Sequence, residues 1–332
     1  NNNSWPDKKA VSAHYNAGQS YEYFLNVHGR NSINGQGGTI YSIINVSEDG
    51  GGFDNAFWNG QAMFYGNGEN IFSQPTARAL DVGGHEMSHG VIQSTANLAY
   101  ENQSGALNES FADIFGAMID RDDWQLGEDI INSAFFPSGA LRDMQDPNNG
   151  GNSFGDNGWQ PKHMDEFVDL PNTPQGNNGG VHVNSGIPNH AYYLFANSVG
   201  KDVAEEIYYD ALVNYLVKSS QFVDLRIAII EVAEQLHGPV VASAAASAFD
   251  GVGIFGGQGG NYQQELGDNP GEDYILFLDE FFSSELGLAD GQGNFITNYT
   301  DPSAAAPARR PSMTDDGSAG VFVGADNGLY RI

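Results

Sequence analysis

Cysteine is absent from this chain of 332 residues, and basic residues are scarce. Without cysteine the chain can have no disulfide framework, no thiolate metal site and no cysteine nucleophile. Only 13 Lys and Arg face 42 Asp and Glu, which gives a formal net charge of −29. Because phosphate binding requires clustered cations, we expect neither a nucleic-acid partner nor an anionic-membrane partner. Like charges also keep molecules apart, so we expect a monomer.

Long apolar runs are missing as well. Stretches such as Val240–Phe249 fall well short of the roughly 18 residues that span a bilayer, so we expect no membrane insertion. Hydrophobic residues still make up 40% of the chain, which is enough for a core and excludes wholesale disorder. The chain begins at Asn1 without an initiator Met, which is typical of a processed product or a fragment.

Hydrophobic periodicity and turn residues divide the chain into three parts. Residues 1–100 mix helix and strand, residues 101–254 are mainly helical, and residues 255–332 are a glycine-rich extension ending in a β-hairpin at Ser312–Ile332. Asp143–Gly180 is loop-rich, and Ser303–Pro311 has the composition of a linker. The expected helices and strands are helices at Ala13–Gly29, Thr76–Ala96, Ser104–Asp122, Ile187–Val199, Lys201–Val217, Val223–Leu236 and Val240–Phe249, and strands at Thr39–Val46 and Gln61–Tyr65. The sequence therefore predicts an α+β protein.

The strongest chemical signal is the run His85-Glu86-Met87-Ser88-His89. On a helix, residues i and i+4 share a face, so both imidazoles can reach one ion. Zinc suits two neutral imidazoles and a carboxylate, with a fourth position left open. Glu86 stands beside the first ligand and is a candidate general base. Two surface histidines on a helix would give the same pattern, so this motif alone leaves both interpretations open.

The following helix supplies carboxylates for two centres. If the helices pack antiparallel, Glu109 falls near His89, Asp113 near His85, and Asp120 near Asp81. Gly116 on the same face would let the helices approach closely. Ligand softness then assigns zinc to the histidine centre and calcium to the carboxylate centre. Asp113 is placed to hold the spare ring nitrogen of His85.

At this point the sequence resembles the thermolysin-like zinc metallopeptidases, from about Ala13 to Ile254. The resemblance rests on motifs that occur in the family's order and spacing, namely Asn55–Gly60, Asp81–His89, Tyr100–Gly116, Leu141–Asp143 with Met144 and Asp146-Pro147, and Gly179–Gly186. It implies a two-lobed fold, with a mixed α/β N-terminal lobe, a mainly helical C-terminal lobe and one catalytic zinc in the cleft between them.

The resemblance also implies a role for each matching residue. His85, His89 and Glu109 would bind zinc, and Glu86 would activate the attacking water. Tyr100 and His182 would donate to the oxyanion, and Arg142 would hold a substrate carbonyl. The implied positions that bind substrate or support the site are Asn55 and Ala56 for the substrate backbone, Val82, Leu126 and Leu141 for an apolar pocket, and Asn108 as the partner of His89.

For calcium, the matching residues are Asp81, Asp120, Asp123 and Glu128, with the backbone carbonyl of Gln125. The segment between Asp120 and Glu128 is shorter than in two-calcium members, so we favour one ion. The implied protein is a secreted, extracellular endopeptidase that acts on protein or peptide substrates and cleaves before bulky hydrophobic residues. A cleaved pro-segment or N-terminal chain is a further candidate partner.

Three departures from the family pattern stand out. The family's N-terminal β-rich stretch is mostly missing, and residues 255–332 have no counterpart in its catalytic domain. Five residues before His182, where the family usually has an aspartate, this chain has Asn177. An amide can accept a hydrogen bond from the imidazole but cannot stabilise an imidazolium, so we expect a lower pKa for His182.

Two other interpretations remain open at this stage. One is a catalytically weak or inactive relative, stabilised by calcium, that acts as a binding or structural module. The other is a processing protease of narrow specificity, which differs only in its substrate.

Overall fold

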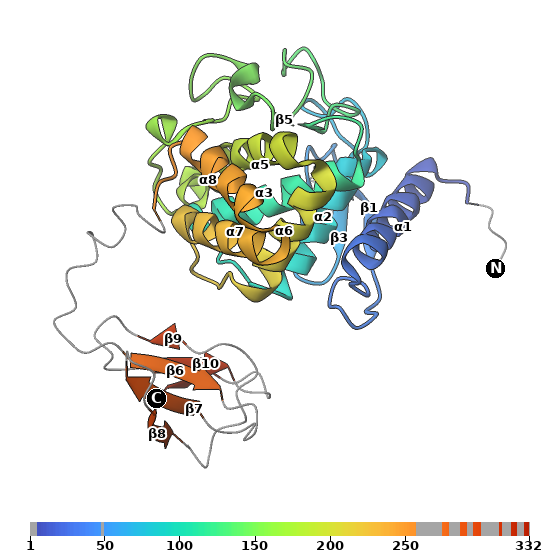
Figure 1. Cartoon of the computed structure of the whole chain (residues 1–332). Helices are drawn as coiled ribbons and strands as arrows, with labels where there is room; N and C mark the ends of the chain where they lie inside the picture. The colour runs from blue at the N-terminus through green and yellow to red at the C-terminus, as the bar shows by residue number, and fades with distance from the viewer. Residues whose placement is uncertain are drawn as a thin grey trace. The chain divides into compact units, whose positions relative to one another are not determined.

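A computed structural model describes residues 5–47 and 50–256 in full, and beyond them six strands by their backbone. The chain separates into two compact units, Asn1–Gly260 and Asn261–Ile332. Within the first unit, helices and a small sheet come first and a set of helices follows, which confirms the predicted α+β class (Figure 1).

The first part of this unit packs two α-helices and a short 3-10 helix against a three-stranded sheet. Its elements are α1 (Lys8–His28), β1 (Ser42–Val46), β2 (Ala56–Trp58), β3 (Met63–Gly66), the 3-10 helix η1 (Thr76–Arg78) and α2 (Leu80–Gln93). The strand order is β1-β3-β2, with β1 parallel and β2 antiparallel to β3. β2 is therefore an edge strand. The sequence predicts one helix over Thr76–Ala96, but the structure divides this range. η1 ends at Arg78, Ala79 has an extended backbone, and α2 begins at Leu80.

The second part is mainly helical. Its elements are α3 (Asn102–Ile119), the paired strands β4 (Gln125–Leu126) and β5 (Arg142–Asp143), the 3-10 helices η2 (Pro147–Gly150), η3 (Met164–Glu166) and η4 (Pro174–Gly176), and the helices α4 (Asn177–Asn184), α5 (Gly186–Val199), α6 (Lys201–Asn214), α7 (Phe222–His237) and α8 (Pro239–Gly251). Among the described residues, no helix is long and apolar enough to cross a membrane.

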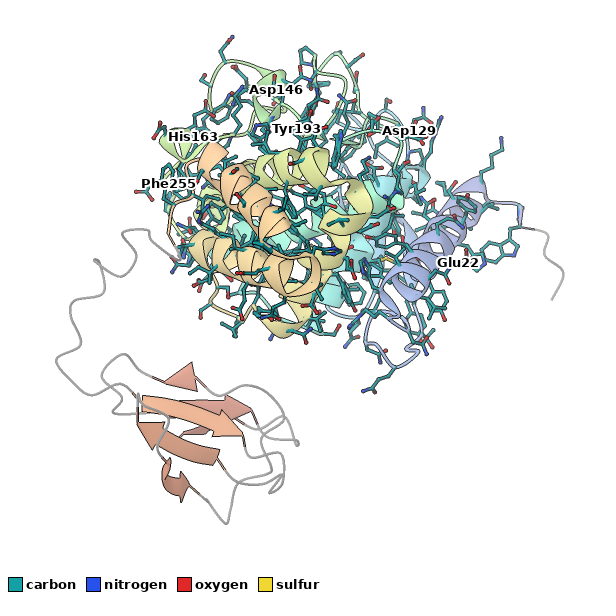
Figure 2. The ribbon with its side chains drawn as sticks, in the orientation of Figure 1. Glu22, Asp129, Asp146, His163, Tyr193 and Phe255 are labelled. Atoms are coloured by element: carbon teal, nitrogen blue, oxygen red, sulfur yellow. The ribbon has the colours of Figure 1, made fainter. Side chains whose placement is uncertain are left out.

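α3 is the centre of the first unit. Its residues from Ser104 to Met118 are all buried, and Phe111 and Phe115 lie in the main hydrophobic core. Charged side chains inside such a helix need partners, because an unpaired buried charge is very costly. Glu109 and Asp113 are the charged residues in the buried part of α3, so they require partners from neighbouring elements. At the surface, by contrast, side chains such as Glu22 and Asp129 project into solvent (Figure 2).

The second unit contains two three-stranded antiparallel sheets. These are β6 (Tyr274–Leu278), β7 (Leu286–Asp290) and β8 (Phe295–Tyr299), in sequence order, and β9 (Ser312–Met313), β10 (Gly320–Val323) and β11 (Leu329–Arg331), with β10 in the middle. β10 and β11 pair within the range where the sequence predicts a hairpin. The predicted linker Ser303–Pro311 lies outside the described residues.

Candidate active site

Two glycines bring α2 and α3 into close contact. A Cβ atom on Gly84 would lie 3.2 Å from the Cα of Gly116, and a Cβ on Gly116 would lie 2.8 Å from the carbonyl oxygen of Asp81. A side chain at Gly116 would collide with the main chain of α2, and one at Gly84 would require its neighbours on α3 to move, so both glycines favour this approach. The close approach predicted for Gly116 is thus present, and it turns one face of α2 towards one face of α3.

His85, His89 and Glu109 converge at this contact. Nε2 of His85 lies 3.0 Å from Nε2 of His89, and the Glu109 carboxylate oxygens lie 3.5 and 3.6 Å from these two nitrogens. The buried Oε2 atom of Glu109 has no hydrogen-bond partner among the described residues. The donor set is the one that zinc prefers, two imidazoles and one carboxylate.

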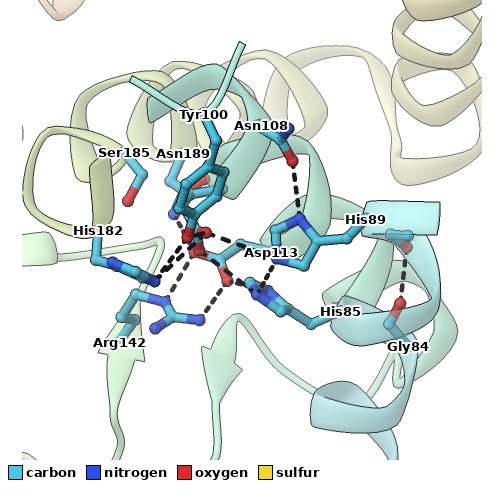
Figure 3. Close-up of polar contacts among 12 residues, drawn as sticks. Gly84, His85, His89, Tyr100, Asn108, Asp113, Arg142, His182, Ser185 and Asn189 are labelled. Atoms are coloured by element: carbon cyan, nitrogen blue, oxygen red, sulfur yellow. Dashed lines mark hydrogen bonds and ion pairs between the residues drawn. The ribbon is translucent and has the colours of Figure 1, made fainter. Parts of the chain in front are cut away.

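The outer ring nitrogens of both histidines are held by side chains of α3 (Figure 3). Nδ1 of His85 lies 2.8 Å from Oδ1 of Asp113, and Nδ1 of His89 lies 2.8 Å from Oδ1 of Asn108. The amide of Asn108 is oriented because its Nδ2 donates to the carbonyl of Leu98. Both Nδ1 atoms therefore donate, and the two Nε2 atoms face each other with lone pairs. A cation between them would relieve this repulsion, so the residues fit a zinc ion.

Asp113 is buried completely and joins His85 to Arg142. Arg142 donates to both Asp113 oxygens, at 2.8 and 2.6 Å, and Asn189 donates to Oδ2 at 2.9 Å. Burial would raise the pKa of Asp113, but Arg142 and His85 hold it well below its usual range. Burial likewise opposes ionisation of Glu109, yet the imidazoles of His182, His89 and His85 lower its pKa to about 2. Both carboxylates are therefore ionised.

Glu86 lies beside the histidines on α2 and lines the same cavity. Its side chain is buried, and Oε2 has no hydrogen-bond partner among the described residues. Burial raises the pKa of Glu86, and His85 and His89 oppose that rise. A raised pKa makes the carboxylate a stronger base, which suits a group that accepts a proton and later returns it.

Tyr100 and His182 approach the centre from the opposite wall, and both are partly exposed. The Tyr100 hydroxyl donates to Oε1 of Glu109 and lies 3.1 Å from Nε2 of His182. Nε2 of His182 is also 3.4 Å from Oε1 of Glu109. Partial burial lowers the pKa of His182, and Glu109 opposes this.

Asn177 contacts His182, but in the opposite sense to the one expected. Nδ2 of Asn177 faces Nδ1 of His182 at 2.8 Å, while the backbone N–H of His182 donates to Oδ1 of Asn177 at 2.7 Å. The amide therefore donates to the imidazole, whereas we expect from the sequence that it accepts. The reason is that the backbone N–H already occupies the amide oxygen.

A cavity of about 440 Å³ lies over this centre. All the predicted substrate-contacting residues line it, namely Asn55, Ala56, Val82, Leu126, Leu141 and Arg142. Sequence reasoning missed further lining residues, namely Phe57, Trp58, Phe72, Thr76, Gln93 and Asn97. Trp58 and Gln93 are joined by a hydrogen bond of 2.7 Å, and no spacing rule connects a strand residue to a helix end 35 positions later.

The carboxylate centre lies one helical turn away along α2. Carboxylate oxygens of Asp81, Asp120 and Glu128 lie within 4.8 Å of one another. Asp81 Oδ1 and Glu128 Oε2 are buried without a hydrogen-bond partner among the described residues. Burial, followed by repulsion from neighbouring carboxylates, raises the pKa of Glu128 to about 8, while burial raises that of Asp81 to about 6. These oxygens fit a hard cation such as calcium.

The other two predicted calcium residues lie on the same segment of the chain. Oδ1 of Asp123 accepts a hydrogen bond of 2.7 Å from the backbone N–H of Gln125. Burial raises the pKa of Asp120 and Glu128, and the Asp123 carboxylate is one of the charges that raise the pKa of both further. The Gln125 side chain donates to Asp143. A calcium-binding role for Asp123 and for the backbone carbonyl of Gln125 stays a prediction.

Comparison with known proteins gives a consistent result. A family model described as the thermolysin metallopeptidase catalytic domain matches residues 1–93, and one described as its alpha-helical domain matches residues 96–254. A bacillolysin of Bacillus amyloliquefaciens is 44% identical over 247 residues, which are 74% of this chain and 44% of the relative. An extracellular elastase of Staphylococcus epidermidis is 42% identical over 249 residues, which are 74% of this chain and 46% of the relative. The match thus spans less than half the length of these two relatives.

A solved structure is also similar. The precursor of protealysin, a metalloproteinase from Serratia proteamaculans, has a TM-score of 0.68 and 33% sequence identity, covering 76% of this chain and 80% of that one.

Proposed function

This chain belongs to the thermolysin family of metallopeptidases, and from that premise we propose that it is a secreted, zinc-dependent endopeptidase. The observation that carries the proposal is the arrangement of His85, His89 and Glu109 with Glu86 beside them, at the floor of a cavity large enough for a peptide. A bound zinc ion would polarise the scissile carbonyl and acidify the attacking water.

The chain's own residues divide the remaining work. Glu86 takes a proton from the attacking water and passes it to the leaving amine, a role that suits its raised pKa. Tyr100 and His182 lie on the opposite wall, where each can donate a hydrogen bond to the oxygen on which negative charge develops, Tyr100 by turning its hydroxyl proton from Glu109 to that oxygen. Asp113 and Asn108 hold His85 and His89 in the tautomer that ligates metal.

In our proposal, the substrate backbone pairs with the edge strand β2 and adds a strand to the sheet β1-β3-β2. β2 is an edge strand, and Asn55 and Ala56 line the cavity, so an extended peptide can pair along it. Arg142 uses Nε and Nη2 to bind Asp113, which leaves Nη1 to hold a substrate carbonyl.

Specificity follows from the apolar part of the wall. Val82, Leu126 and Leu141 form it, which favours cleavage on the N-terminal side of a bulky hydrophobic residue. One methylene group in such a pocket is worth about 10- to 200-fold in kcat/KM. A mass-spectrometric cleavage profile on a peptide mixture tests this directly.

In our proposal, the three carboxylates of Asp81, Asp120 and Glu128 bind one calcium ion. The bound ion would stabilise the fold, which has no disulfides. An extracellular location is supported by the relative named an extracellular elastase, and the proposed calcium site would suit it because calcium is abundant outside cells. The similarity to the protealysin precursor supports a cleaved pro-segment as a partner.

The test of this function is Glu86→Gln in the zinc-loaded protein. We expect zinc to remain bound while hydrolysis of casein falls by about 10²- to 10⁴-fold, because the general base is removed and the metal ligands are kept. Glu22→Gln, which makes the same change on an exposed position of α1, is the matched control and keeps full activity.

A non-catalytic relative would give another result. Zinc at one ion per chain, with no hydrolysis by the unmodified protein and no effect of chelators, would favour a binding or structural module instead.

A further inference from the structure

Two asparagines hold two histidines of the cleft, and they do so in opposite orientations. Asn108 presents its oxygen to Nδ1 of His89, because its nitrogen donates to the carbonyl of Leu98. Asn177 presents its nitrogen to Nδ1 of His182, because its oxygen accepts from the backbone N–H of His182. A main-chain group fixes the orientation of each amide, so neither can turn over without losing a hydrogen bond.

The consequence for each ring is different. His89 carries its proton on Nδ1 and offers a lone pair at Nε2, as a metal ligand must. His182 accepts at Nδ1, so its neutral ring must carry its proton on Nε2. From these contacts we propose that Asn177 is a positioning residue that keeps neutral His182 in the Nε2–H tautomer. His182 then donates a hydrogen bond into the cleft without first being protonated.

The other end of the ring supports the same assignment independently. The single proton of the Tyr100 hydroxyl is donated to Glu109, so the Tyr100 oxygen can only accept from Nε2 of His182, 3.1 Å away. Nε2 must therefore carry hydrogen at this end too. The groups that face His182 are Glu109, Tyr100, Arg142, His85 and His89, and the nearest of them, Glu109 and the Tyr100 oxygen, are acceptors.

The backbone around Asn177 keeps this contact in place. Residues 177–180 all have positive φ, which forms a left-handed turn just before His182. The turn is anchored because the N–H of Asn178 donates to Thr173 and that of Gly179 donates to Pro171. Asn is among the few residues other than Gly that tolerate this conformation, and Asp is another. Asn177→Asp therefore changes the hydrogen bond and leaves the turn intact.

The experiment reads the tautomer directly. In zinc-loaded protein with ¹⁵N-labelled histidine, above the pH at which the imidazole titrates, long-range ¹H–¹⁵N spectra distinguish a protonated from an unprotonated ring nitrogen. His182 is assigned by the signals lost in His182→Gln. We expect unprotonated Nδ1 and protonated Nε2 in the unmodified protein, and the reverse in Asn177→Asp, since a carboxylate can only accept.

Asn178→Asp is the matched control. It adds the same charge at the next residue, with the same left-handed backbone, and its side chain makes no hydrogen bond among the described residues. We expect it to keep the Nε2–H form. An Nδ1–H tautomer in the unmodified protein would overturn the proposal whatever the variants do, and so would an unchanged tautomer in a folded Asn177→Asp.

A kinetic measurement adds the functional consequence, which rests on the proposed peptidase function. At alkaline pH, kcat of Asn177→Asp should fall about 100-fold relative to the unmodified protein, the typical cost of losing one donor to an oxyanion. The ratio should recover at lower pH, where the ring is protonated and donates again. If the unmodified chain hydrolyses no peptide, the proposed function fails while the spectra still decide the tautomer.

Discussion

Two polar centres share the contact between α2 and α3, and they are built on opposite electrostatic principles. At His85, His89 and Glu109, the Nδ1 atoms of both histidines are paired with Asp113 and Asn108, Glu109 accepts a hydrogen bond from Tyr100, and the pKa of Glu109 is low, at about 2. Around Asp81, Asp120 and Glu128, the same two helices bring together carboxylates alone, and the pKa values of Asp81 and Glu128 are raised.

The difference shows what each centre needs from a metal ion. Hydrogen bonds to Asp113 and Asn108, with Arg142 behind Asp113, hold the histidines in the form that binds metal, so the protein itself orients these ligands. The carboxylates of the other centre repel one another when they are ionised, so a bound cation is needed to hold them together. Zinc should thus matter mainly for chemistry, and the cation at the carboxylates mainly for stability.

The largest effect is expected from Asp113→Asn, which removes the charge that orients the histidine centre. The change leaves the Arg142 guanidinium, which is largely buried, without its ionised partner, and breaking a buried pair costs about 3–5 kcal/mol of unfolding free energy. It also weakens the acceptor for His85, which should reduce zinc affinity by about 10- to 100-fold. Urea unfolding and competitive zinc titration measure the two effects.

Asp169→Asn is the control for that variant, because Asp169 is exposed and has no hydrogen bond among the described residues. Equal stability of the two variants would mean that Asp113 is not the residue that orders the histidine centre.

Calcium removal tests the second centre. We expect calcium at about 100 times its dissociation constant to add about 3 kcal/mol to the unfolding free energy, and more at pH 8 than at pH 5.5. The folded pKa values of Asp81 and Glu128, at about 6 and about 8, lie above those of unfolded carboxyls. The calcium-free folded state therefore holds extra protons, and its stability falls as pH rises towards 8. Calcium, which binds the ionised form, offsets this loss.

Thermal unfolding with and without calcium, at constant free zinc and in the Glu86→Gln background to prevent self-digestion, gives the measurement. A calcium-induced shift that is equal at the two pH values, or larger at pH 5.5, would contradict the assignment.

The sequence predicted the histidine centre well because helical spacing is a local rule. His85 and His89 are four residues apart, and the short connection to α3 restricts which carboxylates can face them, so Glu109 and Asp113 follow from the register. The same reasoning placed Asp120 near Asp81. Local rules also identified every long helix of the first unit, with ends that differ by a few residues.

Local sequence rules could not predict features that depend on the orientation of a side chain or on contacts between distant parts of the chain. The residue at position 177 is visible in the sequence, but which end of its amide faces His182 depends on a backbone N–H brought there by a left-handed turn. Phe72 and Thr76 reach the cavity only through tertiary packing.

The smallest predicted effect is the change in stability caused by Glu128→Gln. Its sign should reverse when calcium is added, so it distinguishes the two centres directly. Glu128→Gln removes one of the mutually repelling charges, so the calcium-free protein should become more stable at pH 9. A gain of about 1 kcal/mol corresponds to a rise in Tm of about 2–4 °C. At pH 4, below the ordinary glutamate pKa of 4.5, Glu128 is mostly protonated in both the folded and the unfolded state, so the substitution should have little effect. With calcium present, the variant should be less stable than the unmodified protein, because one ligand is lost.

The adjacent substitution Asp129→Asn separates this local effect from a general reduction of the net charge. Asp129 is exposed and lies outside the group formed by Asp81, Asp120 and Glu128, so its neutralisation removes the same charge without removing a ligand. We expect it to leave the calcium-induced shift in Tm unchanged. If Glu128→Gln lowered the Tm of the calcium-free protein at pH 9, Glu128 would be stabilised by its neighbours rather than repelled by them, and the two centres would not differ in the way argued above.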